Sequence, residues 1–128
     1  MIKIAKNKTI LIKEENNQKI ANVKFADTFF SRLKGIMFKK DLDYVLVLKP
    51  NKINNKRSSA IHTCFMRINI DIVFLDENKK VFEIATLKPW KLHTPKKEAS
   101  YILEMREGSI KKYEIAIGDK LNFVCEFR

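Results

Sequence analysis

The chain has 128 residues, of which 45% are hydrophobic and 32% are charged. This composition suits one folded domain covering residues 1–128 and excludes a disordered or fibrous protein. The formal net charge of +11 favours a polyanionic partner. The lysines are nevertheless spread along the whole chain, which equally suits an ordinary solvated surface.

No segment of the sequence resembles a membrane span or a secretion signal. The longest apolar runs, 45–48 and 72–75, have four residues each, whereas a spanning helix needs about 20. We therefore expect a cytoplasmic protein with no membrane partner. In a reducing compartment Cys64 and Cys125 are expected to be free thiols. Because there is no CxxC pair, we expect no structural zinc, and no motif indicates a cofactor.

Taken in chain order, strand signals dominate the sequence. Eight short segments are rich in valine, isoleucine and phenylalanine and are bounded by turn residues. They are 9–13, 19–26, 44–49, 59–66, 70–76, 80–87, 100–105 and 121–127. The fifth and sixth predict a hairpin, in which Asn78 adopts the left-handed conformation of a tight loop.

Helical signals are few. The best candidate is 26–37, with apolar residues at helical spacing and Gly35 placed to end it. A second short helix is expected at 107–115, closed by Gly118. Since open sheet edges invite aggregation, this pattern predicts a mainly β fold: a compact barrel-like or strongly curled antiparallel or mixed sheet with one or two short helices.

The stretch 61–74 raises the question of a metal site. If it is extended, alternate residues share a face, and one face carries His62, Cys64 and Met66 followed by isoleucines. These are soft ligands that suit copper. However, neighbours on one face of a strand lie about 7 Å apart, too far for three to bind one ion without a bulge. We interpret this face as core and expect no metal.

The opposite face of the same stretch carries a polar trio, Arg67, Asn69 and Asp71. Three interpretations remain open: a solvated sheet face, an internal salt-bridge network at the barrel mouth, or a ligand site in which the arginine binds an anion. A structural role predicts Glu104 as partner of Arg67, and Arg32 or a turn N–H group as partner of Asp71.

Two stretches concentrate the positive charge, 49–57 and 88–97. The second contains Trp90 and His93 in a proline-flanked loop. Trp90 could stack on a nucleic-acid base beside the lysines, but we expect it to be a lid that packs on the core. His93 could act as a base, although its partner is not identifiable. The sequence has no glycine-rich phosphate loop, GxSxG or HExxH motif.

Five blocks occur in an order that resembles a known family, the domain of unknown function 192 or uncharacterised protein family 0127. The blocks are ADTFFSRLKGIM (26–37), MRINIDIVFLDENKKVFEI (66–84), LKPW (87–90), ASYILEMREG (99–108) and IGDKLNF (117–123). The resemblance covers about 26–123 and implies a compact β-rich barrel-like domain with a short helix near its start. We expect 1–25 to pack on this region as further strands. It implies no activity, because the family has no established catalytic residues.

The matching positions include several that the resemblance suggests are structural. Gly35 and Gly118 are expected in turns, and Asp76 and Asp119 near turns. One departure is Asn69, where relatives often have a proline. Proline there would favour an edge strand, whereas asparagine permits a ladder hydrogen bond.

These observations favour a non-enzymatic binding or accessory module, with an anionic small molecule as the ligand. Its candidate binding residues are Arg67, Asn69, Asp71, Arg32, Trp90 and His93, and we assign no catalytic residue. The alternative is a nucleic-acid-binding protein that uses the basic loops 49–57 and 88–97. A small enzyme using His62, His93 or Asp71 is the third hypothesis.

Overall fold

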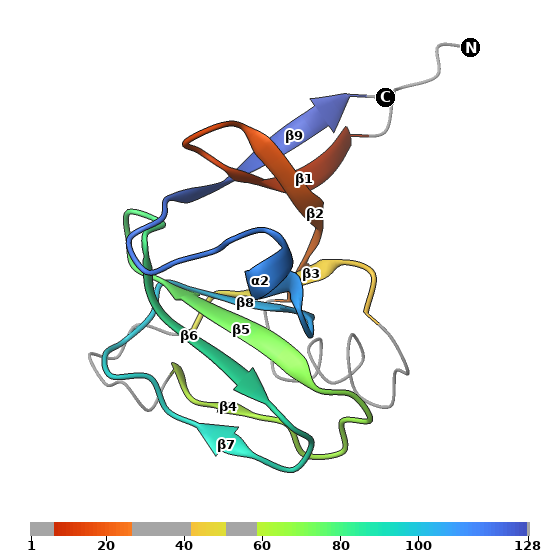
Figure 1. Ribbon diagram of the computed structural model, residues 1–128, viewed down its shortest axis with the longest axis vertical. Coiled ribbons are helices and arrows are strands. Elements are labelled where there is room, and N and C mark those ends of the chain that lie inside the picture. The colour runs from red at the N-terminus through yellow and green to blue at the C-terminus, as the bar shows by residue number, and fades with distance from the viewer. Residues whose placement is uncertain (1–6, 27–41, 51–58, 128) are drawn as a thin grey trace.

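The computed structural model describes residues 7–26, 42–50 and 59–127 (Figure 1). In these ranges the elements are β1 (Asn7–Lys13), β2 (Gln18–Ala26), β3 (Val45–Leu48), β4 (Ile61–His62), β5 (Ile70–Leu75), β6 (Val81–Leu87), β7 (Leu92–His93), β8 (Tyr101–Arg106), α2 (Ser109–Lys112) and β9 (Leu121–Phe127). The helix expected at 26–37 and most of the basic stretch 49–57 lie outside the described residues.

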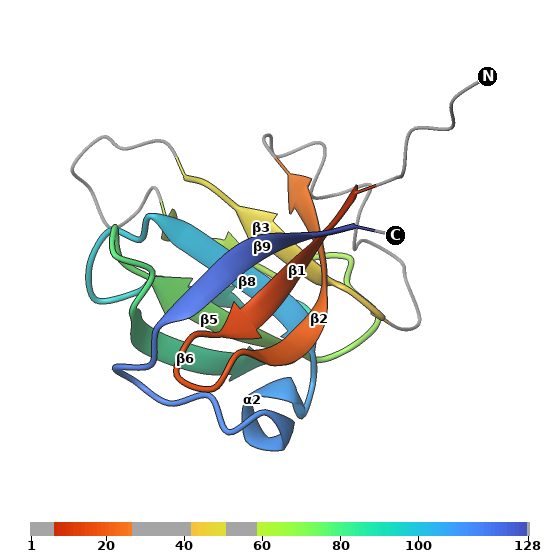
Figure 2. The same cartoon turned by 90° about the horizontal axis from the view of Figure 1, so that it is seen from above.

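Seven strands form one curled mixed sheet, in the order β6-β5-β8-β3-β2-β1-β9. The β2–β3 pair is parallel, and the other neighbouring strands are antiparallel. Figure 2 shows the curl of this sheet, whose outer strands are β6 and β9. A bridge between Lys80 and Lys120 joins them at one end, where the Val81 N–H donates to the Asp119 carbonyl at 2.9 Å. The predicted strongly curled β fold is confirmed.

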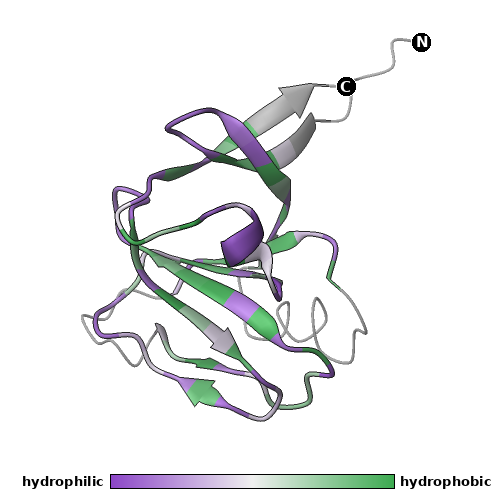
Figure 3. Ribbon diagram, in the orientation of Figure 1, coloured by the Kyte–Doolittle hydropathy of each residue, from purple (hydrophilic) through white to green (hydrophobic). Residues whose placement is uncertain are grey.

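Strand β5 lies inside this sheet and is buried along all six residues. Because side chains alternate across a strand, its two faces supply two cores. Ile70, Ile72 and Phe74 belong to one core, and Val73 and Leu75 belong to the other. Figure 3 shows β5 as a mostly hydrophobic band and α2 as a hydrophilic element. Asn69 therefore does not precede an edge strand, since β5 pairs on both sides.

The β5–β6 hairpin forms as predicted, but with a different residue in the left-handed conformation. Lys79, at φ 61°, adopts it instead of Asn78. The Asp76 carboxylate accepts the N–H groups of Asn78 and Lys80, at 2.8 and 3.0 Å. This aspartate organises the turn, in line with the role that the family resemblance implied.

The predicted strand 59–66 is wrong beyond its first part. Only Ile61–His62 is a strand, β4, and it pairs with β7 in a separate two-stranded sheet. The chain then turns, because Phe65 has φ 63° and the Met66 N–H donates to the Thr63 carbonyl at 3.1 Å. The two alternating faces expected for 61–74 therefore do not exist before β5 begins.

The second predicted helix is present but shorter than 107–115. It begins after Gly108, at φ 92°, and covers Ser109–Lys112. Gly118, at φ 96°, does not close the helix but lies in a later turn. There its N–H donates to the Val81 carbonyl at 2.8 Å. No helix in the described ranges is both long enough and apolar enough to cross a bilayer.

Candidate functional site

Asp71, one residue of the predicted polar trio, is a buried anchor between three elements. Its Oδ2 accepts the N–H groups of Gly108 and Ile110, both at 3.0 Å. Its Oδ1 accepts the Thr86 hydroxyl at 2.8 Å. The strand β5 thus holds the start of α2 and the neighbouring strand β6. Two partners were expected for Asp71. The turn N–H groups are observed, and Arg32 lies outside the described residues.

The other members of the trio lie elsewhere. Asn69 is half-buried before β5, and its Nδ2 donates to Glu107 Oε2 at 2.9 Å. Arg67 is exposed in the same loop. No ion pair joins it to Glu104, which is fully buried on β8, so that expected pairing within the described residues is wrong. Arg32 lies outside them.

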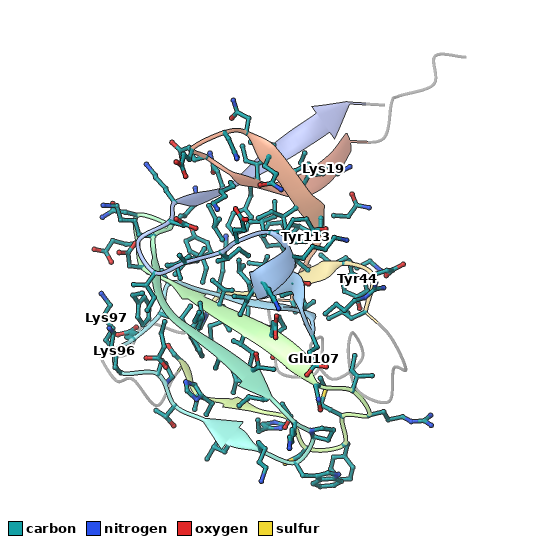
Figure 4. All side chains as sticks on the ribbon, in the orientation of Figure 1. Lys19, Tyr44, Lys96, Lys97, Glu107 and Tyr113 are labelled. Atoms are coloured by element: carbon teal, nitrogen blue, oxygen red, sulfur yellow. The ribbon has the colours of Figure 1, made fainter. Side chains whose placement is uncertain are left out.

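A groove opens beside α2, close to Asp71. It is a cavity of about 480 Å³ between β2, the start of β3, the end of β8 and α2. We call it the α2 groove. It is lined by Lys19, Ile20, Ala21, Asn22, Leu42, Asp43, Tyr44, Val45, Met105, Arg106, Glu107, Gly108, Ser109, Lys112 and Tyr113. In Figure 4 the labelled Lys19, Tyr44, Glu107 and Tyr113 surround it, and Lys96 and Lys97 lie away from it.

Asn22, on the β2 wall of the α2 groove, carries a polar atom without a protein partner. Its Oδ1 is buried and accepts no hydrogen bond from the described part of the chain. An amide oxygen in such a position costs roughly 1–3 kcal/mol unless a donor reaches it. Asn22 is therefore a lining residue of the groove whose amide oxygen has no hydrogen-bond donor among the described residues.

The charges that line the α2 groove have both signs, with an excess of positive charge. Lys19, Arg106 and Lys112 are basic, and Asp43 and Glu107 are acidic. One oxygen of Glu107 is already engaged by Asn69. The Arg106 Nε donates to the Leu42 carbonyl at 3.2 Å, which ties this exposed side chain to the segment before β3.

His93 lies on the other side of the molecule, in β7. Its Nε2 is 2.5 Å from Glu83 Oε2, and its ring lies over Phe74 with centroids 5.5 Å apart. The second Glu83 oxygen accepts the Lys96 N–H at 2.9 Å. The partner that the sequence did not identify is thus Glu83, and the pair packs between β6 and β7.

Trp90 does not pack on the core, so the lid interpretation is wrong. It is 61% exposed, and Phe65 beside it is 49% exposed. Their rings pack edge to face, with the ring centroids 4.7 Å apart. Leu92, two residues later, is 70% exposed. We call Phe65, Trp90 and Leu92 the apolar tip.

A fully buried threonine holds the apolar tip together. The Thr63 carbonyl accepts the Trp90 N–H at 2.9 Å, and the Thr63 N–H donates to the Lys91 carbonyl at 2.8 Å. Its hydroxyl accepts the Lys91 N–H at 2.7 Å and donates to the Lys88 carbonyl at 2.6 Å. Thr63 therefore holds its own loop and the loop 88–91 together through its backbone groups and its hydroxyl.

Of the three residues His62, Cys64 and Met66, which were interpreted as core and not as metal ligands, only Met66 is buried. Met66 is buried in the first core, as the core interpretation predicted. His62 is half-buried, and its Nδ1 accepts the Cys64 N–H at 3.3 Å. Cys64 is a half-buried free thiol.

Comparison with known proteins settles the family. The model of the DUF192 family, described as an uncharacterized ACR, matches residues 10–123. The chain belongs to this family. The match begins within β1 and ends within β9, so every strand of the curled sheet lies wholly or partly within it.

Curated DUF192 relatives carry the family name UPF0127. The UPF0127 protein of Pyrococcus furiosus is 34% identical over 96% of this chain and 97% of its own length. The relative from Pyrococcus horikoshii is 37% identical over 79% of this chain and 86% of its own. The family resemblance found in the sequence is thereby confirmed.

Solved structures share the DUF192 fold. A Sinorhizobium meliloti protein, described as a candidate transcription regulator, has a TM-score of 0.72 at 16% identity, covering 96% of this chain and 98% of its own. A Novosphingobium aromaticivorans protein of unknown function has a TM-score of 0.71 at 19% identity, covering 90% and 83%. At these identities the likeness establishes the fold alone.

Sequence reasoning missed the α2 groove and the apolar tip. The groove combines residues from β2, β3 and β8 that are far apart in sequence, so no local pattern marks it. Asn22 sits in an ordinary strand pattern, where a polar residue indicates a solvated position. The tip depends on positive φ angles at Phe65 and Trp90, which side-chain type does not reveal. The lack of acidic residues around Trp90 was the sequence feature that could have indicated the tip.

Proposed function

We propose that this protein is a non-enzymatic binding module of the cytoplasm whose α2 groove holds an anionic small molecule. The observation that carries the proposal is the buried Asn22 Oδ1 without a described hydrogen-bond donor in the wall of this groove. The cavity volume of about 480 Å³ falls in the range of small-molecule sites, roughly 300–1,000 Å³.

The preference for an anion follows from the groove's charges. Lys19 on β2 and Lys112 on α2 are both exposed, and with Arg106 they outnumber the two acidic residues of the lining, Asp43 and Glu107. The chain's net charge of +11 adds a general attraction for anions. The ligand that fits carries a carboxylate or phosphate for the lysines and an O–H or N–H group for Asn22.

Aromatic side chains supply the apolar contact that such a ligand needs. Tyr113 is half-buried beside Lys112, whose Nζ lies 5.3 Å from the ring centroid. Tyr44 is buried on the opposite wall, with Lys24 Nζ at 4.2 Å from its ring centroid. Aromatic side chains combined with a few polar groups are typical of small-molecule sites.

Several placements argue against catalysis in this groove. Both histidines of the chain, His62 and His93, belong to the β4–β7 sheet and are absent from the groove lining. Asp71 accepts three hydrogen bonds from protein groups, so its carboxylate already serves to hold the fold together. A general base needs access to the proton that it removes.

The test is a titration of the ¹⁵N-labelled chain, followed by amide NMR, with two anions and matched uncharged compounds. Glutarate and glucose 6-phosphate represent the carboxylate and phosphate classes, and glutaramide and glucose are their neutral counterparts. We expect saturable shifts of amides in 19–22 and 105–113 with an anion and none with its neutral counterpart. The absence of saturable shifts in these segments with both anions would overturn the proposal.

Variants locate the binding. Lys19→Gln and Lys112→Gln should each weaken binding of the anion roughly fivefold, as expected for one partly exposed charged contact. Asn22→Leu should weaken it further while retaining the fold. Lys80→Gln, an exposed lysine outside the groove, is the matched control and should leave the affinity unchanged. Equal losses in the control and groove variants would show nonspecific attraction and contradict a built site.

A further inference from the structure

The apolar tip is separate from the α2 groove and has no part in the proposed function. Phe65, Trp90 and Leu92 expose 49%, 61% and 70% of their surface. Leu92 belongs to β7, and Phe65 and Trp90 lie in the turns next to β4 and β7; these two strands are at the opposite end of the molecule from the β1–β9 pair (Figure 1). Clustered exposure of large apolar side chains marks an interaction surface.

Two residues of the tip have a strained backbone conformation. Phe65 and Trp90 both have φ 63°, a left-handed conformation that is rare for bulky residues and costs on the order of 1 kcal/mol or more at each position. The buried Thr63 holds them there through both its backbone groups and its hydroxyl. Such strain persists where the surrounding structure fixes it, and it clusters at functional sites.

Positive charge predominates around the tip, and the nearby Glu83 is engaged by His93 and by the Lys96 N–H group. The segments 59–70 and 84–97, which contain the tip, include no acidic residue. Lys88 and Lys91 flank Trp90, and both are exposed. The tip therefore combines an apolar point with a basic collar, and its electrostatic complement is an extended anionic surface.

We propose that the apolar tip docks this protein onto the surface of an anionic lipid bilayer. Phe65, Trp90 and Leu92 enter the interface, where aromatic rings are preferred, and Lys88 and Lys91 contact the anionic headgroups. This contact is peripheral and needs no spanning segment. It revises the expectation of no membrane partner, which was based on the lack of such a segment.

Two features favour lipid over single-stranded nucleic acid. Leu92 is the most exposed member of the tip, and an aliphatic side chain does not stack on a base but is readily buried among acyl chains. The Phe65 and Trp90 rings meet at 61°, so they form a wedge instead of a flat stacking platform.

The size of the tip favours lipid over a protein partner. A stable protein interface covers about 800 Å² on each side. Three partly exposed side chains provide at most a few hundred Å². A bilayer requires no complementary shape, so a small wedge with a basic collar is sufficient for reversible binding.

The chain itself carries the reporter for the test. Trp90 is its single tryptophan, so its fluorescence comes from the tip alone. The full chain is titrated with vesicles of phosphatidylcholine and phosphatidylserine (70:30) and with vesicles of phosphatidylcholine alone. We expect a blue shift with the anionic vesicles, at least tenfold weaker partition into the neutral ones, and quenching by brominated acyl chains.

Substitutions distinguish the contribution of apolar insertion to vesicle binding from the contribution of the positive charges. Leu92→Ser should weaken partition about tenfold, and the pair Lys88→Gln/Lys91→Gln should weaken it about 25-fold, fivefold for each lysine. Ile117→Ser is the matched apolar control, because Ile117 is 62% exposed away from the tip. Lys111→Gln/Lys120→Gln is the matched charge control, and both controls should partition like the unchanged protein.

The proposal is overturned if anionic vesicles leave the Trp90 emission unchanged at millimolar lipid. It is also overturned if the control variants lose as much partition as the tip variants. A parallel titration with oligo-dT tests the competing partner: quenching of Trp90 by the oligonucleotide, without a response to vesicles, would assign the tip to nucleic acid.

Discussion

At the scale of single residues, Asp71 is the most heavily bonded side chain of the predicted polar trio. We expect Asp71→Ala to lower the free energy of unfolding by about 2–4 kcal/mol, because the N–H groups of Gly108 and Ile110 and the Thr86 hydroxyl would then lose their acceptor. Urea denaturation measures the loss. Thr86→Val removes one hydrogen bond and leaves the N–H contacts intact, so about 1 kcal/mol is expected. Equal losses in the two variants would refute the anchoring role.

Truncation of two adjacent residues should change stability to very different extents. Met66 is buried in the first core, so Met66→Ala should cost about 2–5 kcal/mol. Phe65 is 49% exposed, so Phe65→Ala should change stability by less than about 1 kcal/mol. Thermal unfolding of the two variants tests this. A larger loss for Phe65→Ala would mean that its ring supports the fold.

The sequence singled out Asp71 as chemically unusual but could not identify its partners. Gly108 and Ile110 are 37 and 39 residues away, and the contact arises because β5 and β8 pair in register. Arg67, in contrast, stands only four positions from Asp71 in the sequence but is exposed. The chemical type of a residue can be read from the sequence, whereas its burial depends on which distant strand packs beside it in the fold.

At the scale of elements, burial and pairing predict a graded hydrogen exchange. β5 is buried along its full length and hydrogen-bonded on both sides, so its amides should exchange at rates governed by global unfolding. β4 and β7 have two residues each and pair mainly with one another. Their amides should exchange at least about 100-fold faster. Native-state exchange by NMR measures both, and equal protection would contradict this order.

Most strands were predictable because their sequences have strong periodicity or are continuously apolar. The buried run Ile70–Leu75 is the clearest, because a strand that is covered on both faces is not expected to alternate between apolar and polar residues. The error at 59–66 has a different origin. The segment has strand-like composition, but Thr63 makes its hydrogen bonds to Lys88 and Lys91 instead of continuing a ladder.

At the scale of the whole molecule, composition and the family resemblance together predicted a curled β fold. The meeting of the outer strands at Lys80 and Lys120 was foreseeable only as a general tendency of sheets to protect their edges. The α2 groove and the apolar tip were not foreseeable. Each depends on the relative position of segments that the sheet brings together, and this position is a property of the complete fold.

The pairing of β1 with β9 has a consequence for how the molecule is made. Seven residue pairs, from Asn7 with Phe127 to Lys13 with Leu121, join the two strands, although nearly the whole chain separates them. During translation β1 therefore emerges from the ribosome long before its partner exists. Its edge must stay unpaired or be shielded by a chaperone until synthesis reaches β9. Closing so long a loop is entropically costly, so the final docking of β9 is expected to set the folding rate.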